Sequence, residues 1–181
     1  MKFRLTKDLS YFIVIAVLIA TLGQLYYQKE VHFSPARVYY NKDTELNTKL
    51  ISLIQDSNEY VYFAIYTFTR YDIKDALLGA KHRGVKVIGL TDKDQIQKID
   101  SQEKIVQQLR EAGIPVYVQD HSKIMHLKVL VTEKAYASGS YNWTASATTG
   151  NDEVLEIGTD PTMHKEYQDI LERLFYKYGT Q

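Results

Sequence analysis

The sequence contains no cysteine and has no excess of either charge, since basic and acidic residues number 22 each. The lack of cysteine excludes disulfide bonds, thiol nucleophiles and zinc sites with cysteine ligands. The balanced charge argues against a strongly basic nucleic-acid-binding chain, so any contact with nucleic acid would depend on local patches. With 181 residues, 45% of them hydrophobic, the chain is long enough for one globular domain with a sizeable core.

Charge is also absent from a long stretch near the N-terminus, from Leu9 to Gln28. This stretch is strongly apolar and about as long as a helix needs to cross a bilayer, roughly 20 residues. Residues 1–8 are basic, with Lys2, Arg4 and Lys7, which predicts a cytoplasmic N-terminus and a domain on the far side of the membrane. We therefore expect residues 9–28 to form a membrane anchor.

Two other interpretations of this stretch stay open. One is a cleaved signal peptide, with its apolar region at Tyr11–Ala20 and a small residue at Gly23, which would release the domain as a secreted or periplasmic protein. The other is a buried core helix. The sequon Asn142-Trp143-Thr144 would place a glycan inside the site described below, which favours a bacterial-type envelope over passage through the endoplasmic reticulum.

Residues 31–181 form the predicted soluble domain, which holds 18 basic and 20 acidic residues and no low-complexity tract or repeat. Its apolar runs alternate between strand-like and helix-like spacing in the first half, and strands dominate the second half. This order predicts an α/β fold with a mixed β-sheet flanked by helices. The predicted strands are 60–69, 85–91, 114–118, 127–131, 134–138 and 153–159, and the predicted helices are 43–54, 72–83, 101–112 and 161–178.

Two cation-capable side chains interrupt the apolar strand that follows Met125. Side chains alternate between the two faces of a strand, so His126 and Lys128 share one face while Leu127 and Val129 point to the other, which we expect to pack inward. A turn with the sequence Gly-Ser-Tyr-Asn follows the next strand, and its polar groups can converge on an anion. The pattern therefore predicts an anion site, although each part alone is typical of an ordinary solvated surface.

Together these parts resemble a known signature. The segments "HLKVLVTE", "GSYNWTASA" and "NDE" are similar to the HKD motif, HxKx4D followed by GSxN, of the phospholipase D superfamily. The likeness is to its short members with one motif per chain, the bacterial Nuc-type endonucleases and the mitochondrial Zucchini-type proteins. It extends over residues 31–178, and it implies the phospholipase D-like α-β-α sandwich.

The resemblance also implies a role for each matching residue. His126 would be the nucleophile that forms a phosphohistidine, and Lys128 and Asn142 would bind the phosphate oxygens and stabilise charge in the transition state. Ser140 lies in the same turn and would assist in binding phosphate. Glu153 would accept a hydrogen bond from the nucleophilic imidazole and so orient it. The family mechanism requires no metal or cofactor, and the sequence contains no convincing metal-ligand cluster.

One motif supplies one histidine, whereas the mechanism needs two: a neutral imidazole that attacks and a protonated one that releases the alcohol. The resemblance therefore implies a homodimer in which two copies of His126 meet across a two-fold axis. The motif's acid position is Glu133 instead of aspartate, and the turn after it is one residue shorter than usual. We expect Glu133 to support the site without touching the phosphate.

Several other residues are of interest but lack a full motif. A competing HxK pair, His121 and Lys123, has no acid at the right spacing, so we interpret it as loop residues at the rim of the cleft. Tyr141 and Trp143 are candidates for stacking on bases, with packing the stronger expectation for Trp143. Tyr66, Thr67 and Thr69 follow the apolar part of a strand, at an end where sites often form.

The expected function is therefore cleavage of nucleic-acid phosphodiester bonds without a metal. The chemistry at phosphorus is the same for lipid phosphodiesters, so phospholipase activity is the alternative, and the membrane anchor favours it. A third possibility is a degenerate domain that binds nucleic acid or a partner protein without catalysis.

Overall fold

The computed structural model describes residues 7–30 and 36–179, and it divides the chain into two units after Ser34. The first unit contains the helix α1 (Lys7–Glu30), whose side chains from Tyr11 to Gln24 are exposed. Helical structure is thus confirmed for the apolar stretch. The predicted membrane span is not supported, because within the described parts of the chain no helix is long and apolar enough to cross a membrane.

The second unit, Pro35–Gln181, is built on a seven-stranded mixed sheet with the strand order β1-β7-β6-β5-β2-β3-β4. Parallel pairing joins β2, β3 and β4, and antiparallel pairing joins β5, β6, β7 and β1. The two halves meet where β2 pairs antiparallel with β5. The strands are β1 (Ala36–Tyr40), β2 (Tyr60–Ile65), β3 (Lys86–Asp92), β4 (Val116–Gln119), β5 (Lys128–Thr132), β6 (Tyr136–Gly139) and β7 (Val154–Gly158).

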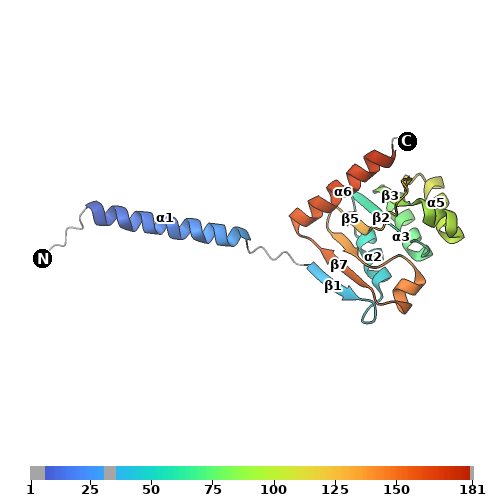
Figure 1. Ribbon diagram of the computed structural model, residues 1–181, viewed down its shortest axis with the longest axis horizontal. Coiled ribbons are helices and arrows are strands. Elements are labelled where there is room, and N and C mark those ends of the chain that lie inside the picture. Colours follow the sequence, from blue (N-terminus) through green and yellow to red (C-terminus); the bar gives the residue numbers. More distant parts are fainter. Residues whose placement is uncertain (1–6, 31–35, 180–181) are drawn as a thin grey trace. The chain divides into compact units, whose positions relative to one another are not determined.

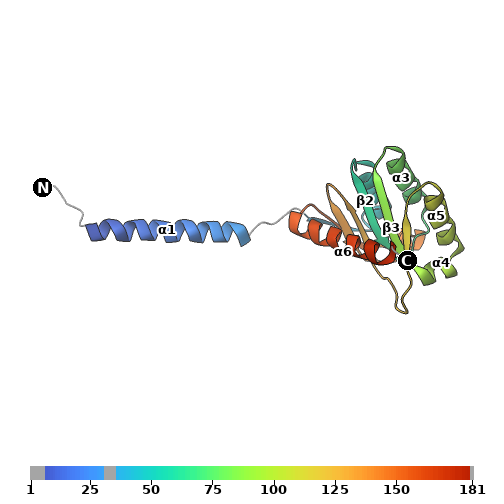
Figure 2. The ribbon, with the colours of Figure 1, turned by 90° about the horizontal axis from the view of Figure 1, so that it is seen from above.

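Helices cover both faces of this sheet, as Figures 1 and 2 show. On one face lie α2 (Leu46–Gln55), α3 (Tyr71–His82) and α5 (Asp100–Glu111), and on the other lies α6 (Pro161–Gly179). The short elements α4 (Lys93–Lys98) and a π-helix (Ser146–Gly150) complete the domain. The prediction of an α/β fold with a mixed sheet between helices is confirmed.

The sheet has a hydrophobic core on each face, which corrects one expectation about β5. Leu130 belongs to the core under α2, α3 and α5, whereas Val129 and Val131 belong to the core under α6. Side chains of β5 therefore alternate as predicted, but both faces are buried and neither is solvated. The face shared by His126 and Lys128 reaches solvent only at the edge of the sheet.

Most predicted elements lie within a few residues of their observed bounds. The helix expected from residue 43 begins at Leu46, with Glu45 as its N-cap residue. The extended segment that opens the domain is the edge strand β1, which pairs in register with β7 from Ala36 opposite Gly158 to Tyr40 opposite Val154. The short helix α4 was not predicted. At its N-terminus the Asp92 side chain caps the helix by accepting a hydrogen bond from the Gln95 N–H.

Candidate active site

Four strand ends come together at one edge of the sheet. Since β2 and β5 are antiparallel, Ile65 at the end of β2 lies opposite Lys128 at the start of β5. Likewise Gly139 at the end of β6 lies opposite Leu155 near the start of β7. The HxK residues, the GSYN turn and Glu153 adjoin these ends, so the topology gathers residues that are far apart in the sequence.

Lys128 is a buried cation, only 8% exposed. Its ammonium donates a hydrogen bond to the carbonyl oxygen of His126 at 3.0 Å and lies 5.3 Å from the centre of the Tyr66 ring. Desolvation by burial lowers the pKa of Lys128, and the negative charge of Glu153 acts in the opposite direction. This charge lies at the end of the sheet, near the face of the Tyr66 ring and within electrostatic reach of Glu153.

His126 precedes β5, and its side chain is exposed. The His126 imidazole contacts the ring of Tyr66, with 4.8 Å between the two ring centres and an angle of 63° between their planes. Its backbone is fixed from both sides: the Asp92 carboxylate accepts from the Met125 N–H at 2.8 Å, and the Tyr66 N–H donates to the Leu127 carbonyl at 2.9 Å. An exposed side chain on a fixed backbone is what a nucleophile requires.

The GSYN turn brings Ser140 and Asn142 to the same edge. Gly139 is required there, because a Cβ at this position would lie 2.2 Å from the Val154 carbonyl oxygen. The Asn142 side-chain oxygen accepts a hydrogen bond from the Thr67 N–H at 3.2 Å, directly beside Tyr66. Because the amide oxygen is used in this bond, the NH2 group remains available to donate hydrogen bonds to an anion.

Glu153 is buried, with 7% of its surface exposed, just before β7. Its two carboxylate oxygens accept hydrogen bonds from Ser140 Oγ and from Asn151 Nδ2, the latter at 3.0 Å. Ser140 Oγ also accepts from the Val154 N–H at 3.1 Å, so its single hydroxyl proton is used on Glu153. Neither of these carboxylate partners is His126, and the predicted contact between Glu153 and the imidazole stays a prediction.

Glu133 lies at the far end of β5 from His126, roughly 23 Å away along an extended strand. One of its oxygens accepts a hydrogen bond from the Asn58 N–H at 2.8 Å. Desolvation by burial raises the pKa of Glu133, but backbone N–H groups at Asn58 and at Glu133, Glu59 and Tyr60 outweigh it, so the pKa lies below its usual value. Glu133 thus ties β5 to the segment before β2, and its predicted support of the site stays a prediction.

Gln102, a fully buried residue of α5, was not among the predicted site residues. Its amide donates to the Tyr66 carbonyl at 3.0 Å and to the Thr91 hydroxyl at 2.8 Å, and it accepts from the Phe68 N–H at 2.9 Å. Gln102 therefore holds the loop that carries Tyr66. One signal was available: Gln102 falls on the apolar stripe of its helix, at i−3 and i−7 from Ile105 and Leu109.

The other residues singled out in the sequence lie in an exposed loop or are packed in the core. Gln119 is buried and its amide donates to the His121 carbonyl at 3.0 Å, which keeps His121 and Lys123 in an exposed loop, as expected. Tyr141 and Trp143 are 1% and 2% exposed. Neither ring can stack on a base, so that expectation is wrong for Tyr141, and the packing role expected for Trp143 is confirmed.

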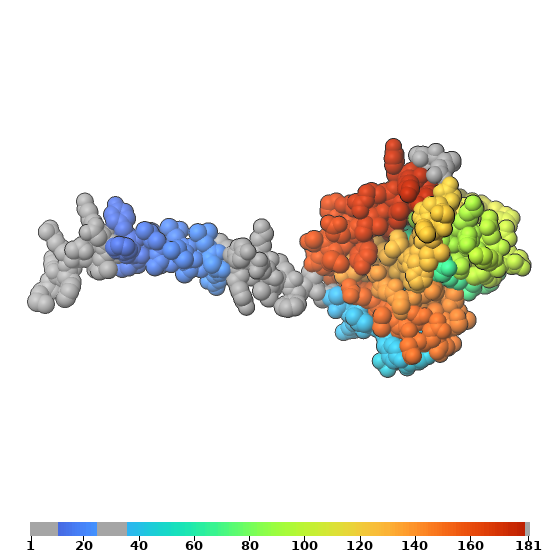
Figure 3. Space-filling model, viewed as in Figure 1, coloured from blue at the N-terminus to red at the C-terminus, as the bar shows by residue number. Residues whose placement is uncertain are grey.

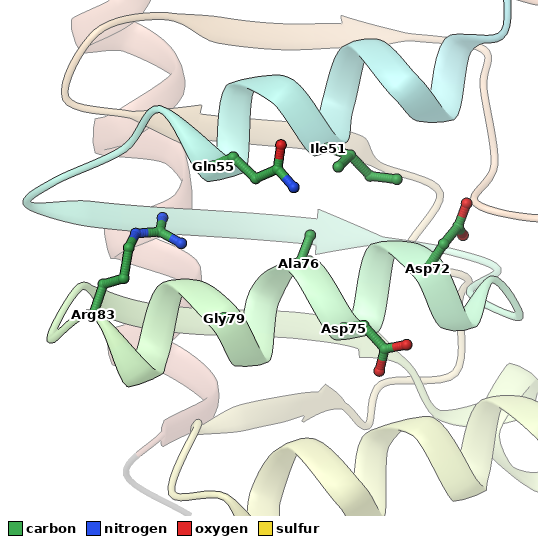
Figure 4. Close-up of a pocket in the computed structure, with 7 residues that line it drawn as sticks. All are labelled: Ile51, Gln55, Asp72, Asp75, Ala76, Gly79 and Arg83. Atoms are coloured by element: carbon green, nitrogen blue, oxygen red, sulfur yellow. The ribbon is translucent and has the colours of Figure 1, made fainter.

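The candidate site lies on an open surface. The segment leading into β5, yellow in Figure 3, is at the surface between the C-terminal helix and the helices drawn in green. A groove of about 400 Å³ between α2 and α3, shown in Figure 4, is lined by other residues, among them Ile51, Asp72 and Arg83. Across residues 7–30 and 36–179, no group of three or more His, Cys, Asp or Glu side chains could hold a metal ion.

Comparisons with known proteins agree with this geometry. A family model described as "Cardiolipin synthase, PLD-like domain" matches residues 50–175. The "Mitochondrial cardiolipin hydrolase" of Xenopus tropicalis is 33% identical over 132 residues, covering 72% of this chain and 61% of the relative. The chain spans about 60% of the length of the curated relatives it matches.

Two solved structures share the fold. Nuc, a phospholipase D family member from Salmonella typhimurium, superposes with a TM-score of 0.71 at 25% identity, over 77% of this chain and 92% of that one. NucT from Helicobacter pylori gives the same TM-score and identity over 78% and 96%. The resemblance seen in the sequence is thus confirmed, and the chain belongs to the phospholipase D-like family.

Proposed function

We propose that the domain is a metal-independent phosphodiesterase that cleaves nucleic acid through a phosphohistidine at His126. The observation that carries the proposal is the pairing of an exposed imidazole with a buried ammonium, held together by the 3.0 Å bond from Lys128 to the His126 carbonyl. Both groups stand at a sheet edge beside the amide of Asn142, and the site has the chemistry that transfer of a phosphoryl group needs.

The reaction proceeds in two balanced steps. In the first, the neutral His126 imidazole attacks phosphorus, a P–N bond forms, and the P–O bond to the leaving alcohol breaks as that oxygen takes a proton from a second imidazole. In the second, the second imidazole removes a proton from water, whose oxygen attacks phosphorus and displaces His126. Lys128 and the Asn142 amide bind the non-bridging oxygens throughout.

The second imidazole comes from a second copy of the chain. An ordinary imidazole has a pKa of about 6.5 and can act as a base or as an acid near neutrality. The side chain of His126 is exposed, so the imidazole of a second copy of the chain can approach it. A two-fold dimer would place two copies of His126 and Lys128 on one phosphate and enclose it.

Two observations favour a lipid substrate as the second candidate. One is the name of the Xenopus tropicalis relative, a cardiolipin hydrolase. The other is Ile124, an apolar side chain that is 57% exposed two residues before His126, where it could enter the apolar part of a lipid layer. The same phosphohistidine chemistry would serve either substrate, so the substrate has to be decided by experiment.

The test is cleavage by the full chain in EDTA of three substrates: single-stranded DNA, single-stranded RNA and vesicles that contain cardiolipin. We expect cleavage of nucleic acid, and loss of that activity in His126→Ala. Trapping of a phosphorylated protein by rapid denaturation in alkali, where a P–N bond to imidazole is stable, from wild type and not from His126→Ala would identify the intermediate. Cleavage of cardiolipin alone would select the lipid function, whereas binding without turnover of any phosphodiester would leave a non-catalytic binding domain.

A further inference from the structure

Tyr66 touches both members of the catalytic pair. Its ring lies 4.8 Å from the ring of His126, centre to centre, and the ammonium of Lys128 lies 5.3 Å from its centre. The aromatic ring thus bridges the exposed nucleophile and the buried cation. In this chain the carboxylate expected to orient His126, that of Glu153, is occupied by Ser140 and Asn151.

The contacts of Tyr66 with His126 and with Lys128 rest on different interactions. Two aromatic rings at this separation and tilt attract each other through their quadrupoles, which favours one orientation of the imidazole. An ammonium near a ring face within about 6 Å is attracted by the negative potential of that face, most strongly where water is excluded. The first contact restricts the rotation of His126, and the second favours the charged form of Lys128.

The backbone that carries the Tyr66 ring is held by several hydrogen bonds. Its main chain donates to the Leu127 carbonyl and accepts from the buried Gln102 amide at 3.0 Å. The next residue, Thr67, is bonded to Asn142. The ring therefore sits on a backbone that is fixed to the segment of His126, to α5 and to the GSYN turn at once.

We propose that Tyr66 is a positioning residue, whose ring sets the orientation of the His126 imidazole and keeps the Lys128 ammonium at the sheet edge. Its effect on turnover rests on the proposed function, but the contacts can be measured without it. The charged and titratable groups that face Lys128 are Tyr66 from the end of β2, His126 from the segment before β5, and Glu153 from the segment before β7. Asp92 faces the His126 segment through Met125.

Opposing effects set the pKa of Lys128, so removal of the Tyr66 ring should change the pH profile of activity. Burial lowers the pKa of Lys128, and the charge of Glu153 raises it. A ring face that favours the ammonium acts in the same direction as Glu153. Removing the ring lowers the pKa of Lys128 further, so the alkaline limb of the activity profile moves to lower pH, which loss of packing alone would not cause.

The experiment compares Tyr66→Phe, which keeps the ring, with Tyr66→Leu, which removes it. The matched control is Tyr39→Leu, because Tyr39 on β1 also carries an ammonium near its ring, that of Lys49 at 5.1 Å, away from the site. We expect Tyr66→Leu to lower kcat about 10- to 100-fold, the size of effect that a misplaced reacting group produces. Tyr66→Phe and Tyr39→Leu should stay close to wild type, and all variants are checked for folding by circular dichroism.

The second measurement is NMR of the full chain labelled at lysine and histidine. In wild type, the ring current of Tyr66 should displace the ε-methylene signals of Lys128 upfield, and Tyr66→Leu should abolish that displacement and lower the titration midpoint of Lys128. An undisplaced signal in wild type overturns the proposal even if Tyr66→Leu does not fold. Equal losses in Tyr66→Phe and Tyr66→Leu would also overturn it, by assigning the effect to the hydroxyl group.

The two proposals fail separately. If the wild-type chain cleaves no phosphodiester while the NMR signals behave as expected, the proposed function is wrong and the contact of Tyr66 stands. If the chain is active but Tyr66→Leu matches Tyr39→Leu in rate and in pH profile, the proposed function stands and Tyr66 has no positioning role.

Discussion

The ammonium of Lys128 is bonded to the main-chain carbonyl of His126 at 3.0 Å. The charge that is to bind the phosphate is thus tied to the backbone of the residue that is to attack it. This bond links Lys128, the first residue of β5, to a residue two positions earlier in the chain, so the spacing of the two groups is set by local backbone geometry.

Replacing Lys128 by Met should abolish activity and stabilise the fold. Met has a similar length and no charge, so the variant loses phosphate binding but also loses the desolvation cost of a cation that is 8% exposed. We expect an increase of about 0.5–2 kcal/mol in the free energy of unfolding at pH 7, which is the usual size of a single stabilising substitution. Urea unfolding measures it, and a variant less stable than wild type would refute the argument.

The pH dependence of the stability difference between wild type and Lys128→Met supplies a control. The pKa of Lys128 is lowered in the folded state from its ordinary 10.5, so the folded state binds this proton more weakly than the unfolded state. The cost to wild type is full below the folded-state pKa and disappears as pH rises toward 10.5. The stability advantage of Lys128→Met should therefore shrink over that window, and an advantage that grows with pH would contradict the assignment.

Replacing Glu133 by Gln should weaken the fold and spare the chemistry. The Glu133 carboxylate accepts from the Asn58 N–H at 2.8 Å, on the far end of β5 from His126. A charge-assisted bond of this kind contributes about 1.5–3 kcal/mol, and we expect a loss of that order at pH 7 with kcat nearly unchanged. The neighbouring exposed residue gives the control, Glu59→Gln, which should not change stability.

The stability lost in Glu133→Gln should also depend on acid pH. Because the pKa of Glu133 is lowered in the folded state from 4.5, its contribution is present above the unfolded value and is lost as pH falls through the folded one. Unfolding curves of wild type and variant should therefore converge as pH falls below 4.5 and through the folded-state pKa. A difference that persists unchanged into acid would show that charge is not its origin.

Replacing Gln102 by Met should damage both the fold and the site. The Tyr66 carbonyl, the Phe68 N–H and the Thr91 hydroxyl would each lose a buried partner. Each unpaired buried group costs about 1–3 kcal/mol, so we expect a clear fall in Tm together with a loss of activity. Gln107→Met is the control on the same helix, since Gln107 is exposed and bonds only within α5, to Glu111.

Mixing wild type with His126→Ala should inhibit more than in proportion. If two copies share one site, mixed dimers contain one imidazole and are inactive, so an equal mixture that has exchanged subunits retains about one quarter of the activity. Independent sites in separate chains would retain about one half. The measurement is turnover at constant total protein after mild unfolding and refolding of the mixture, and a linear dependence on the wild-type fraction would exclude the shared site.

The sequence was informative where the pattern is local. Strand alternation placed His126 and Lys128 on one face, and the apolar runs located six of the strands and four of the helices of the domain. Motif spacing, joined to a family resemblance, named Asn142 and Glu153, which adjoin strand ends on the same side of the sheet, and their predicted roles stay predictions. These features depend on short-range geometry, which residue order encodes directly.

Contacts made by tertiary structure were less accessible. Tyr141 looks like a surface aromatic in a polar turn, yet its ring is buried and its hydroxyl lies 2.7 Å from Thr148 Oγ1. The partners of Gln102 come from the ends of β2 and β3, so no spacing within α5 could reveal them. The actual partners of Glu153 were missed for the same reason, since sequence alone does not show that Ser140 and Asn151 lie closer to its carboxylate than His126 does.

The junction of β2 with β5 also bears on how the chain reaches its native state. Ile65 and Lys128 pair across it from distant parts of the sequence, whereas the parallel unit of β2 and β3 and the hairpin of β5 and β6 are each made from near neighbours. Contacts between distant segments carry the larger loop-closure cost and form slowly. On refolding, helical circular dichroism should therefore recover before enzymatic turnover, which makes turnover a reporter of the last step of assembly.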